Sequence, residues 1–198
     1  MAGPVFEPIR GTYVHLPLDG RPHRLYFEEA GQGTPLVCLH TAGADGRQFR
    51  HLLNDEAITR HYRVLAFDMP WHGKSLPPAG WQDEEYRLTT RGYVELILAF
   101  CDALGLERSA WIGHSFGGLL VAELAARAPE RVGCAVLLDP ALHIDPSVAA
   151  TQADGTRPDV SFASADEAIE ARLSGGTLFT TPHAILEEEA EAHLERGE

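Results

Sequence analysis

Basic residues are scarce in this chain of 198 residues, where 16 lysines and arginines stand against 29 aspartates and glutamates. The net charge of −13 excludes a protein that binds nucleic acid or anionic membranes through general electrostatic attraction. No apolar run approaches the roughly 20 residues of a transmembrane helix, and the first residues lack the charged and apolar segments of a signal peptide. We therefore expect a cytoplasmic protein that binds neither nucleic acid nor membranes.

Cysteine is also rare, and its positions suggest no disulfide and no metal. Cys38, Cys101 and Cys134 form no close pair and lack the spacing of metal ligands. Two of them lie inside apolar runs, so we expect reduced, buried thiols. No histidine pair has ligand spacing on a credible element, and the glycine patterns of phosphate and dinucleotide sites are absent. We predict no metal and no cofactor.

Hydrophobic residues make up 44% of the chain, which is enough for one globular core. A strand pair is indicated at 11–16 and 22–28. Short, nearly continuous apolar runs follow, and runs apolar on both faces are typical of buried parallel strands. These runs are 35–39, 64–67, 110–112 and 132–138. Helical patterns lie between the runs, so we predict an α/β fold with a mostly parallel sheet.

Helix signals between the strands are clear in two places. Apolar residues at helical spacing between 94 and 104 follow Thr89 and Thr90, either of which could cap the helix. Residues 116–128 are rich in glycine, alanine and leucine and stop before Pro129. Both segments are predicted to be helices that cover the sheet.

The final quarter of the chain differs in character from the rest. Residues 144–198 hold three basic and twelve acidic residues, and the strand signal vanishes after residue 139. Ser164 with Glu167 resembles a capping box that opens a helix, and Thr181 before Pro182 predicts the start of another. We expect two helices here, the second with a solvated acidic face.

One stretch carries the chemistry. A short apolar strand runs into Gly113-His114-Ser115-Phe116-Gly117, a G-x-S-x-G pattern, and a helix of small residues follows. A sharp strand–turn–helix needs small residues on either side of the turn, which Gly113 and Gly117 supply. The turn would hold the Ser115 hydroxyl at a helix N-terminus, where free N–H groups favour developing negative charge. Ser115 is therefore the predicted nucleophile.

With this motif, three further segments in consistent order resemble the α/β-hydrolase superfamily. They are 36–43, similar to the strand and His-Gly loop of the oxyanion hole; 67–75, similar to the Asp-x-x-Gly-x-Gly-x-Ser loop; and 135–141, similar to the strand after the nucleophile helix. The resemblance covers residues 11 to about 143. It implies a hydrolase core over 1–143, with six strands and the nucleophile elbow. Residues 144–198 would form a partial helical cap, and the last two strands of the core would be missing.

The resemblance also implies an oxyanion hole made of backbone N–H groups. One donor would be Phe116 and the other Ala42 or Thr41. The family usually has glycine where this chain has Thr41, so the choice between these two donors stays open. Because the donors belong to the backbone, side-chain identity matters mainly through the local backbone shape.

Other residues near the motif have smaller expected roles. His40, His114 and Trp71, which replaces a glycine of the family pattern, are expected to line the pocket, and His40 also to brace the oxyanion loop. Asp139 follows a core strand at the point where some relatives carry the acid of the triad. The segment 47–48 is expected to lie on a helix surface.

A catalytic histidine is not evident. In this fold the order is serine, acid, histidine, and three histidines follow Ser115. Of these, His143 shares a loop with Asp139, while His183 and His193 lie on the acidic helix, and none follows an apolar strand. We expect the base to lie outside this chain.

The run 132–138 supports the same expectation, because it is apolar on both faces and no later strand signal could pair with it. An exposed edge of this kind is an aggregation hazard. We therefore expect the chain to be the N-terminal part of a longer polypeptide. A second chain would carry the remaining strands, or the present chain would self-associate.

The leading hypothesis is a serine hydrolase that acts on a small or medium ester, lactone or thioester through an acyl-enzyme on Ser115. Relatives that open epoxides or displace halide normally carry aspartate at the nucleophile position, so Ser115 argues against those reactions. Two alternatives stay open. One is a cofactor-free C–C bond hydrolase, and the other is a non-catalytic scaffold that binds a small ligand.

Overall fold

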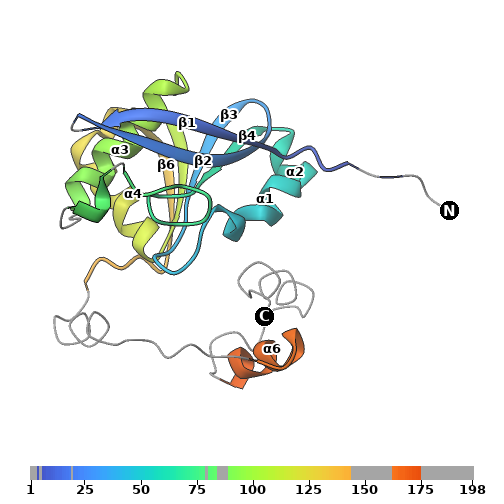
Figure 1. Ribbon diagram of the computed structural model, residues 1–198. Coiled ribbons are helices and arrows are strands. Elements are labelled where there is room, and N and C mark those ends of the chain that lie inside the picture. Colours follow the sequence, from blue (N-terminus) through green and yellow to red (C-terminus); the bar gives the residue numbers. More distant parts are fainter. Residues whose placement is uncertain are drawn as a thin grey trace. The chain divides into compact units, whose positions relative to one another are not determined.

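The computed structural model of the protein describes residues 4, 6–18, 20–78, 80–83, 89–143 and 162–174 (Figure 1). The chain divides into two compact units, Met1–His143 and Ile144–Glu198.

The first unit is built on a six-stranded sheet in the order β1-β2-β4-β3-β5-β6. Its strands are β1 (Arg10–Leu18), β2 (Arg21–Gly31), β3 (Thr34–Leu39), β4 (Tyr62–Phe67), β5 (Ser109–His114) and β6 (Val132–Leu138). β1 and β2 form an antiparallel hairpin, and β2 is antiparallel to β4. The other three pairings are parallel, which confirms the predicted mostly parallel sheet. The carboxyl ends of β3 to β6 consequently meet at one edge.

Helices cover both faces of this sheet. They are η1 (Gly46–Phe49), α1 (Arg50–Asn54), α2 (Glu56–Thr59), η2 (Trp81–Asp83), α3 (Thr90–Ala103), α4 (Phe116–Arg127) and η3 (Pro129–Arg131). In Figure 1, α3 and α4 lie on one side of the sheet, and α1 and α2 on the other. Thr89 is the cap of α3, since its Oγ1 accepts the Gly92 N–H at 3.1 Å. α4 ends at Arg127, just before Pro129, as predicted.

Both faces of the central strands are buried. In β3, Val37 and Leu39 belong to the core under α3 and α4, while Leu36 and Cys38 belong to a second core under α1. The ring of Phe100 lies 4.7 Å from that of Phe67, between α3 and β4. This double coverage explains why the parallel strands appear in the sequence as continuous apolar runs.

β6 lies at the edge of the sheet. It pairs with β5 on one side, and no strand in the described ranges lies on its other side. Val136, Leu137 and Leu138 are 50%, 39% and 45% exposed, although neighbouring side chains of a strand point to opposite faces. Both faces of this apolar strand are therefore open within the described part of the molecule.

The position of β6 corrects one expectation about the cysteines. Cys38 and Cys101 are buried as expected, but Cys134 is exposed on β6. An apolar run predicts burial only if neighbouring elements cover it, and here they do not. Burial raises the pKa of both Cys38 and Cys101 to about 12, so these two thiols stay protonated.

The second unit contains α6 (Ala165–Ser174). Its predicted capping box is present in part, because Ser164 Oγ accepts the Glu167 N–H at 3.2 Å. The Glu167 carboxylate accepts the N–H of Ala163 at 2.6 Å rather than that of Ser164. The helix predicted after Thr181, with its two histidines, lies outside the described residues. None of the helices that the structure describes is long and apolar enough to cross a membrane.

The exposure of the thiols leads to a first prediction. In the folded chain of 198 residues by itself, iodoacetamide at neutral pH should alkylate Cys134 and leave the two buried thiols unmodified, because only an accessible thiolate reacts. Peptide mass mapping after brief labelling would show the sites. Denaturant supplies the control, since all three cysteines should then react. Equal protection of all three thiols in this folded chain by itself would contradict the exposed edge.

Candidate active site

Ser115 lies at a sharp turn between β5 and α4. Its φ of 51° and ψ of −110° are unusual for a residue with a side chain, and its hydroxyl makes no capping bond to α4. The Ser115 N–H donates to the Leu138 carbonyl at 2.9 Å, and the Ala141 N–H donates to the Ser115 carbonyl at 3.0 Å. Such strain costs about 1–3 kcal/mol and persists only where the surroundings enforce it, most often at functional sites.

The two glycines of the motif permit a very close backbone contact. A Cβ atom at Gly117 would overlap the carbonyl oxygen of Leu39 and meet that of His40. One at Gly113 would overlap the Gly117 carbonyl. The first turn of α4 therefore packs directly on the backbone at the end of β3. This contact brings the loop after β3 next to Ser115.

The loop after β3 holds the two backbone donors between which the sequence left the choice open. The Thr41 N–H donates to Gln48 Oε1 at 3.1 Å, so it is already engaged. In the described part of the chain, no acceptor takes the N–H of Ala42 or that of Phe116 in the first turn of α4. Ala42 is exposed. Ala42 and Phe116 are therefore the available pair of donors at this turn.

Gln48 was expected on a helix surface, and the structure places its side chain between two loops instead. Besides accepting the Thr41 N–H, its Nε2 lies 2.6 Å from His114 Nδ1. His114 is half-buried and is the last residue of β5. No local sequence pattern marks this contact, because the two residues are 66 positions apart.

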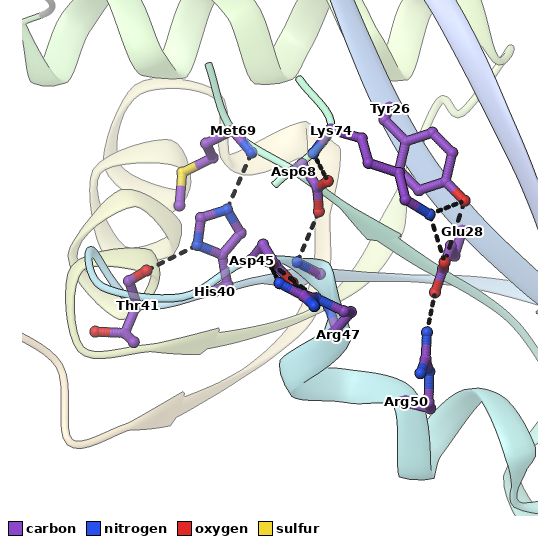
Figure 2. Close-up of polar contacts among 11 residues, drawn as sticks. Tyr26, Glu28, His40, Thr41, Asp45, Arg47, Arg50, Asp68, Met69 and Lys74 are labelled. Atoms are coloured by element: carbon purple, nitrogen blue, oxygen red, sulfur yellow. Dashed lines mark hydrogen bonds and ion pairs between the residues drawn. The ribbon is translucent and has the colours of Figure 1, made fainter. Parts of the chain in front are cut away.

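His40 is fully buried, so the expectation that it lines a pocket is wrong. The Met69 N–H donates to its Nε2 at 3.0 Å, and its Nδ1 lies 2.7 Å from the Thr41 carbonyl (Figure 2). A backbone N–H can only donate and a carbonyl can only accept, so the ring is neutral with its proton on Nδ1. Burial lowers the pKa of His40 to about 4. These two bonds join the loop after β3 to the loop after β4.

Asp68 organises the loop that follows β4 (Figure 2). One carboxylate oxygen accepts the Gly46 N–H at 2.8 Å and the other accepts the Lys74 N–H at 2.7 Å. The Ser75 hydroxyl donates to the Asp68 carbonyl at 2.6 Å. Burial nevertheless raises the pKa of Asp68, because desolvation outweighs these two bonds.

Charged side chains surround this loop on its outer side (Figure 2). Tyr26 donates its hydroxyl proton to Glu28 at 3.1 Å, and Lys74 and Arg50 each lie 3.8 Å from the Glu28 carboxylate. These contacts join β2, α1 and the loop after β4. Burial raises the pKa of Tyr26, and the nearby Glu28 charge adds to this effect.

Asp45, just before η1, binds the guanidinium of Arg47 through both carboxylate oxygens. It also accepts the Arg47 backbone N–H at 2.9 Å, which caps η1. Burial acts to raise the pKa of Asp45, but the hydrogen bonds and the charge of Arg47 outweigh it, so the pKa is lowered. Asp45 therefore stays ionised and fixes the start of η1.

Trp71 and His72 lie at the outer part of the same loop. Trp71 has a φ of 71°, a value that favours glycine, at the position where the family pattern has glycine. Its indole is half-exposed and packs edge-on against Trp81, with 4.8 Å between ring centroids. His72 Nε2 lies 2.9 Å from the Ala42 carbonyl, which connects this loop to the loop after β3.

Asp139 follows β6 directly and is exposed, with a φ of 40°. The preceding residue, Leu138, accepts the Ser115 N–H, so Asp139 lies at the same edge of the sheet as Ser115. His143 is exposed four residues later. No hydrogen bond joins a described histidine side chain to Ser115. Within the described ranges, no group of three or more histidine, cysteine or acidic side chains could hold a metal ion.

A second prediction concerns the close contact at Gly117. Gly117→Ala should destabilise the protein by about 1–3 kcal/mol, because the new methyl group meets backbone atoms that cannot rotate away. Gly43→Ala is the matched control, since a Cβ there meets nothing within 4 Å. Urea unfolding of both variants would measure the difference. Equal stability of the two variants would refute the contact.

A third prediction follows from the neutral His40. Unfolded histidine titrates near 6.5 and His40 near 4, so the unfolded state binds the extra proton between these values. The stability contributed by neutral His40 is complete above pH 6.5 and is lost as the pH falls towards 4. The total loss is about 3 kcal/mol, converted from the pKa difference.

Urea unfolding between pH 7 and pH 4 would measure this loss. His40→Asn should lower stability at pH 7 but flatten its dependence on pH. His15→Asn, at an exposed position on β1, should leave the pH dependence unchanged. An unaltered pH dependence in His40→Asn would contradict the assignment.

Comparisons with known proteins identify the family and the fold. A sequence model of the alpha/beta hydrolase fold matches residues 34–186. The chain is 36% identical over 127 residues to bifunctional epoxide hydrolase 2 of Sus scrofa, covering 63% of this chain and 22% of that protein. It is 31% identical over 108 residues to the pimeloyl-[acyl-carrier protein] methyl ester esterase of Aliivibrio fischeri, and this match covers 54% of this chain and 37% of that protein.

Among solved structures, an alpha/beta hydrolase from Novosphingobium aromaticivorans superposes with a TM-score of 0.74 at 23% identity, covering 98% of this chain and 66% of that one. This likeness shows the fold. The chain spans only 22% to 40% of the length of the curated relatives it matches first. The family match over more than half of the sequence shows that the chain belongs to the alpha/beta hydrolase fold family.

Proposed function

We propose that this protein is a serine hydrolase, with Ser115 as the nucleophile that attacks the carbonyl carbon of a small or medium ester, lactone or thioester. The observation that carries the proposal is the strained Ser115 between β5 and α4, with its hydroxyl uncommitted at the start of a helix. The free N–H groups of Phe116 and Ala42 support it, because they can receive negative charge that develops beside Ser115.

The proposed reaction has two stages. The Ser115 O–H bond breaks, its proton passes to a base, and Oγ bonds to the carbonyl carbon. The tetrahedral oxyanion accepts hydrogen bonds from the Phe116 and Ala42 N–H groups. The bond to the leaving alcohol or thiol then breaks, and that group takes the proton. Water adds to the acyl-enzyme in the same way, releasing the acid and restoring the serine.

The base is proposed to come from further polypeptide that pairs with β6. The open edge of β6 supports this, since its apolar side chains are exposed on both faces. The short span of the chain relative to its relatives supports it as well. A histidine held there would lie at the same edge as Asp139, our candidate for the acid. The added polypeptide would be a continuation of this chain or a second, different chain. The remaining alternative is self-association, in which another copy of this chain covers β6.

A second function, a scaffold that binds a small ligand without reaction, is favoured by one observation. No hydrogen bond joins a described histidine side chain to Ser115, and a serine without a base is a poor nucleophile. Cleavage of a C–C bond uses the same nucleophile and oxyanion donors. It is supported by a 30% identical relative from Comamonas testosteroni that is named as a 2-hydroxy-6-oxo-6-phenylhexa-2,4-dienoate hydrolase.

The decisive experiment is the reaction of a fluorophosphonate probe with the protein isolated from its natural source. Intact mass under denaturing conditions first shows whether the polypeptide exceeds 21.6 kDa or co-purifies with another. We expect one probe molecule on Ser115, none in Ser115→Ala, and normal labelling in Ser164→Ala, a serine of α6's cap. Absence of labelling at Ser115 in the folded protein would favour the binding scaffold.

A further inference from the structure

We propose that Gln48 is a positioning residue that holds the loop after β3 and the residue before Ser115 in one fixed arrangement. Its carboxamide is the only described side chain that bonds to both Thr41 and His114, at 3.1 Å and 2.6 Å. These two residues follow β3 and end β5, two neighbouring parallel strands. The catalytic part of this inference depends on the proposed function, but the structural part does not.

The direction of each hydrogen bond follows from the donors involved. The Thr41 N–H can only donate, so the oxygen of the Gln48 carboxamide faces it. The amide nitrogen then faces His114 Nδ1, and because it can only donate, Nδ1 must carry a lone pair. Neutral His114 consequently has its proton on Nε2. One backbone N–H thus determines the tautomer of the histidine beside the nucleophile.

The position of Gln48 is itself fixed by its surroundings. Asp45 caps η1 through the Arg47 N–H and also binds the Arg47 guanidinium. The side chain of Arg47 is therefore held by Asp45, while that of its neighbour Gln48 bonds to Thr41 and His114. Gln48 is half-buried, which limits competition from water for its two bonds. Its backbone N–H donates to the Asp45 carbonyl at 3.1 Å, which adds a third restraint.

The bridge has a consequence for the proposed oxyanion hole. By taking the Thr41 N–H, Gln48 removes one of two adjacent donors and leaves the Ala42 N–H available. A donor aimed in advance at the developing charge needs no reorganisation during reaction. Without Gln48, the Thr41 peptide could turn toward the site and the Ala42 donor would lose its fixed direction.

The structural test needs no activity. Gln48→Glu keeps an oxygen for the Thr41 N–H but offers no donor to His114. Ring ¹⁵N NMR near pH 8.5, where ordinary histidines are neutral, should show the His114 proton on Nε2 in the wild type and on Nδ1 in Gln48→Glu. Gln32→Glu, an exposed change at the opposite edge of the sheet, should leave His114 unaltered. An unchanged His114 tautomer in folded Gln48→Glu would overturn the proposal.

The functional test uses the polypeptide that reacts with the fluorophosphonate probe, with phenyl acetate as substrate. Gln48→Met, of similar length but without the bridge, should lower kcat about 10- to 100-fold and change KM less than about threefold. The loss should be smaller than the roughly 100- to 1,000-fold loss of a removed oxyanion donor, because the Ala42 N–H is misdirected but still present. An unchanged kcat would overturn the positioning role. A tautomer switch in a protein that neither labels nor turns over would instead count against the proposed function and leave the bridge established.

Discussion

The contact between the first turn of α4 and the backbone at the end of β3 is the constraint on which the candidate site depends. Gly117 permits it, because any side chain there would overlap the Leu39 carbonyl. The contact places the loop after β3 beside Ser115, and the Ser115 N–H joins the same turn to the end of β6. The carboxyl ends of β3, β5 and β6 are thereby held together. The arrangement costs folding free energy because the backbone of Ser115 is strained.

Around this contact, buried and half-buried polar side chains hold the loops in place because each has its hydrogen-bond partners. His40 bonds to both adjacent loops in its neutral form, Asp68 receives two backbone N–H groups, and Gln48 bridges β3 to β5. An unpaired polar group would carry a large penalty at such depth, so these bonds favour one loop arrangement over others. These hydrogen bonds fix the direction of the N–H donors of the proposed oxyanion hole. Donors that are fixed in advance can stabilise a developing negative charge without reorganising during the reaction.

In contrast to these well-packed loops, β6 has an unpaired edge in the described part of the sheet. Its apolar side chains are exposed, and Asp139 at its end is exposed as well. The turn that holds Ser115 therefore lies beside β6, whose free edge can pair with a further strand. In the proposed hydrolase, the base arrives on the polypeptide that covers this edge, so burial of β6 and completion of the active site would be a single event. The coupling would keep Ser115 unreactive until the sheet is complete.

Local pattern was sufficient to predict the mostly parallel sheet, a helix cap at Thr89 or Thr90 and the turn at Ser115, because each depends on residues a few positions apart. Tertiary structure alone decided three other properties: the exposure of Cys134, the complete burial of His40 and the bridge made by Gln48. Each of these depends on which distant segments lie alongside. An apolar run does not reveal whether a neighbour covers it, and a glutamine does not reveal which histidine, 66 residues away, will share its amide proton.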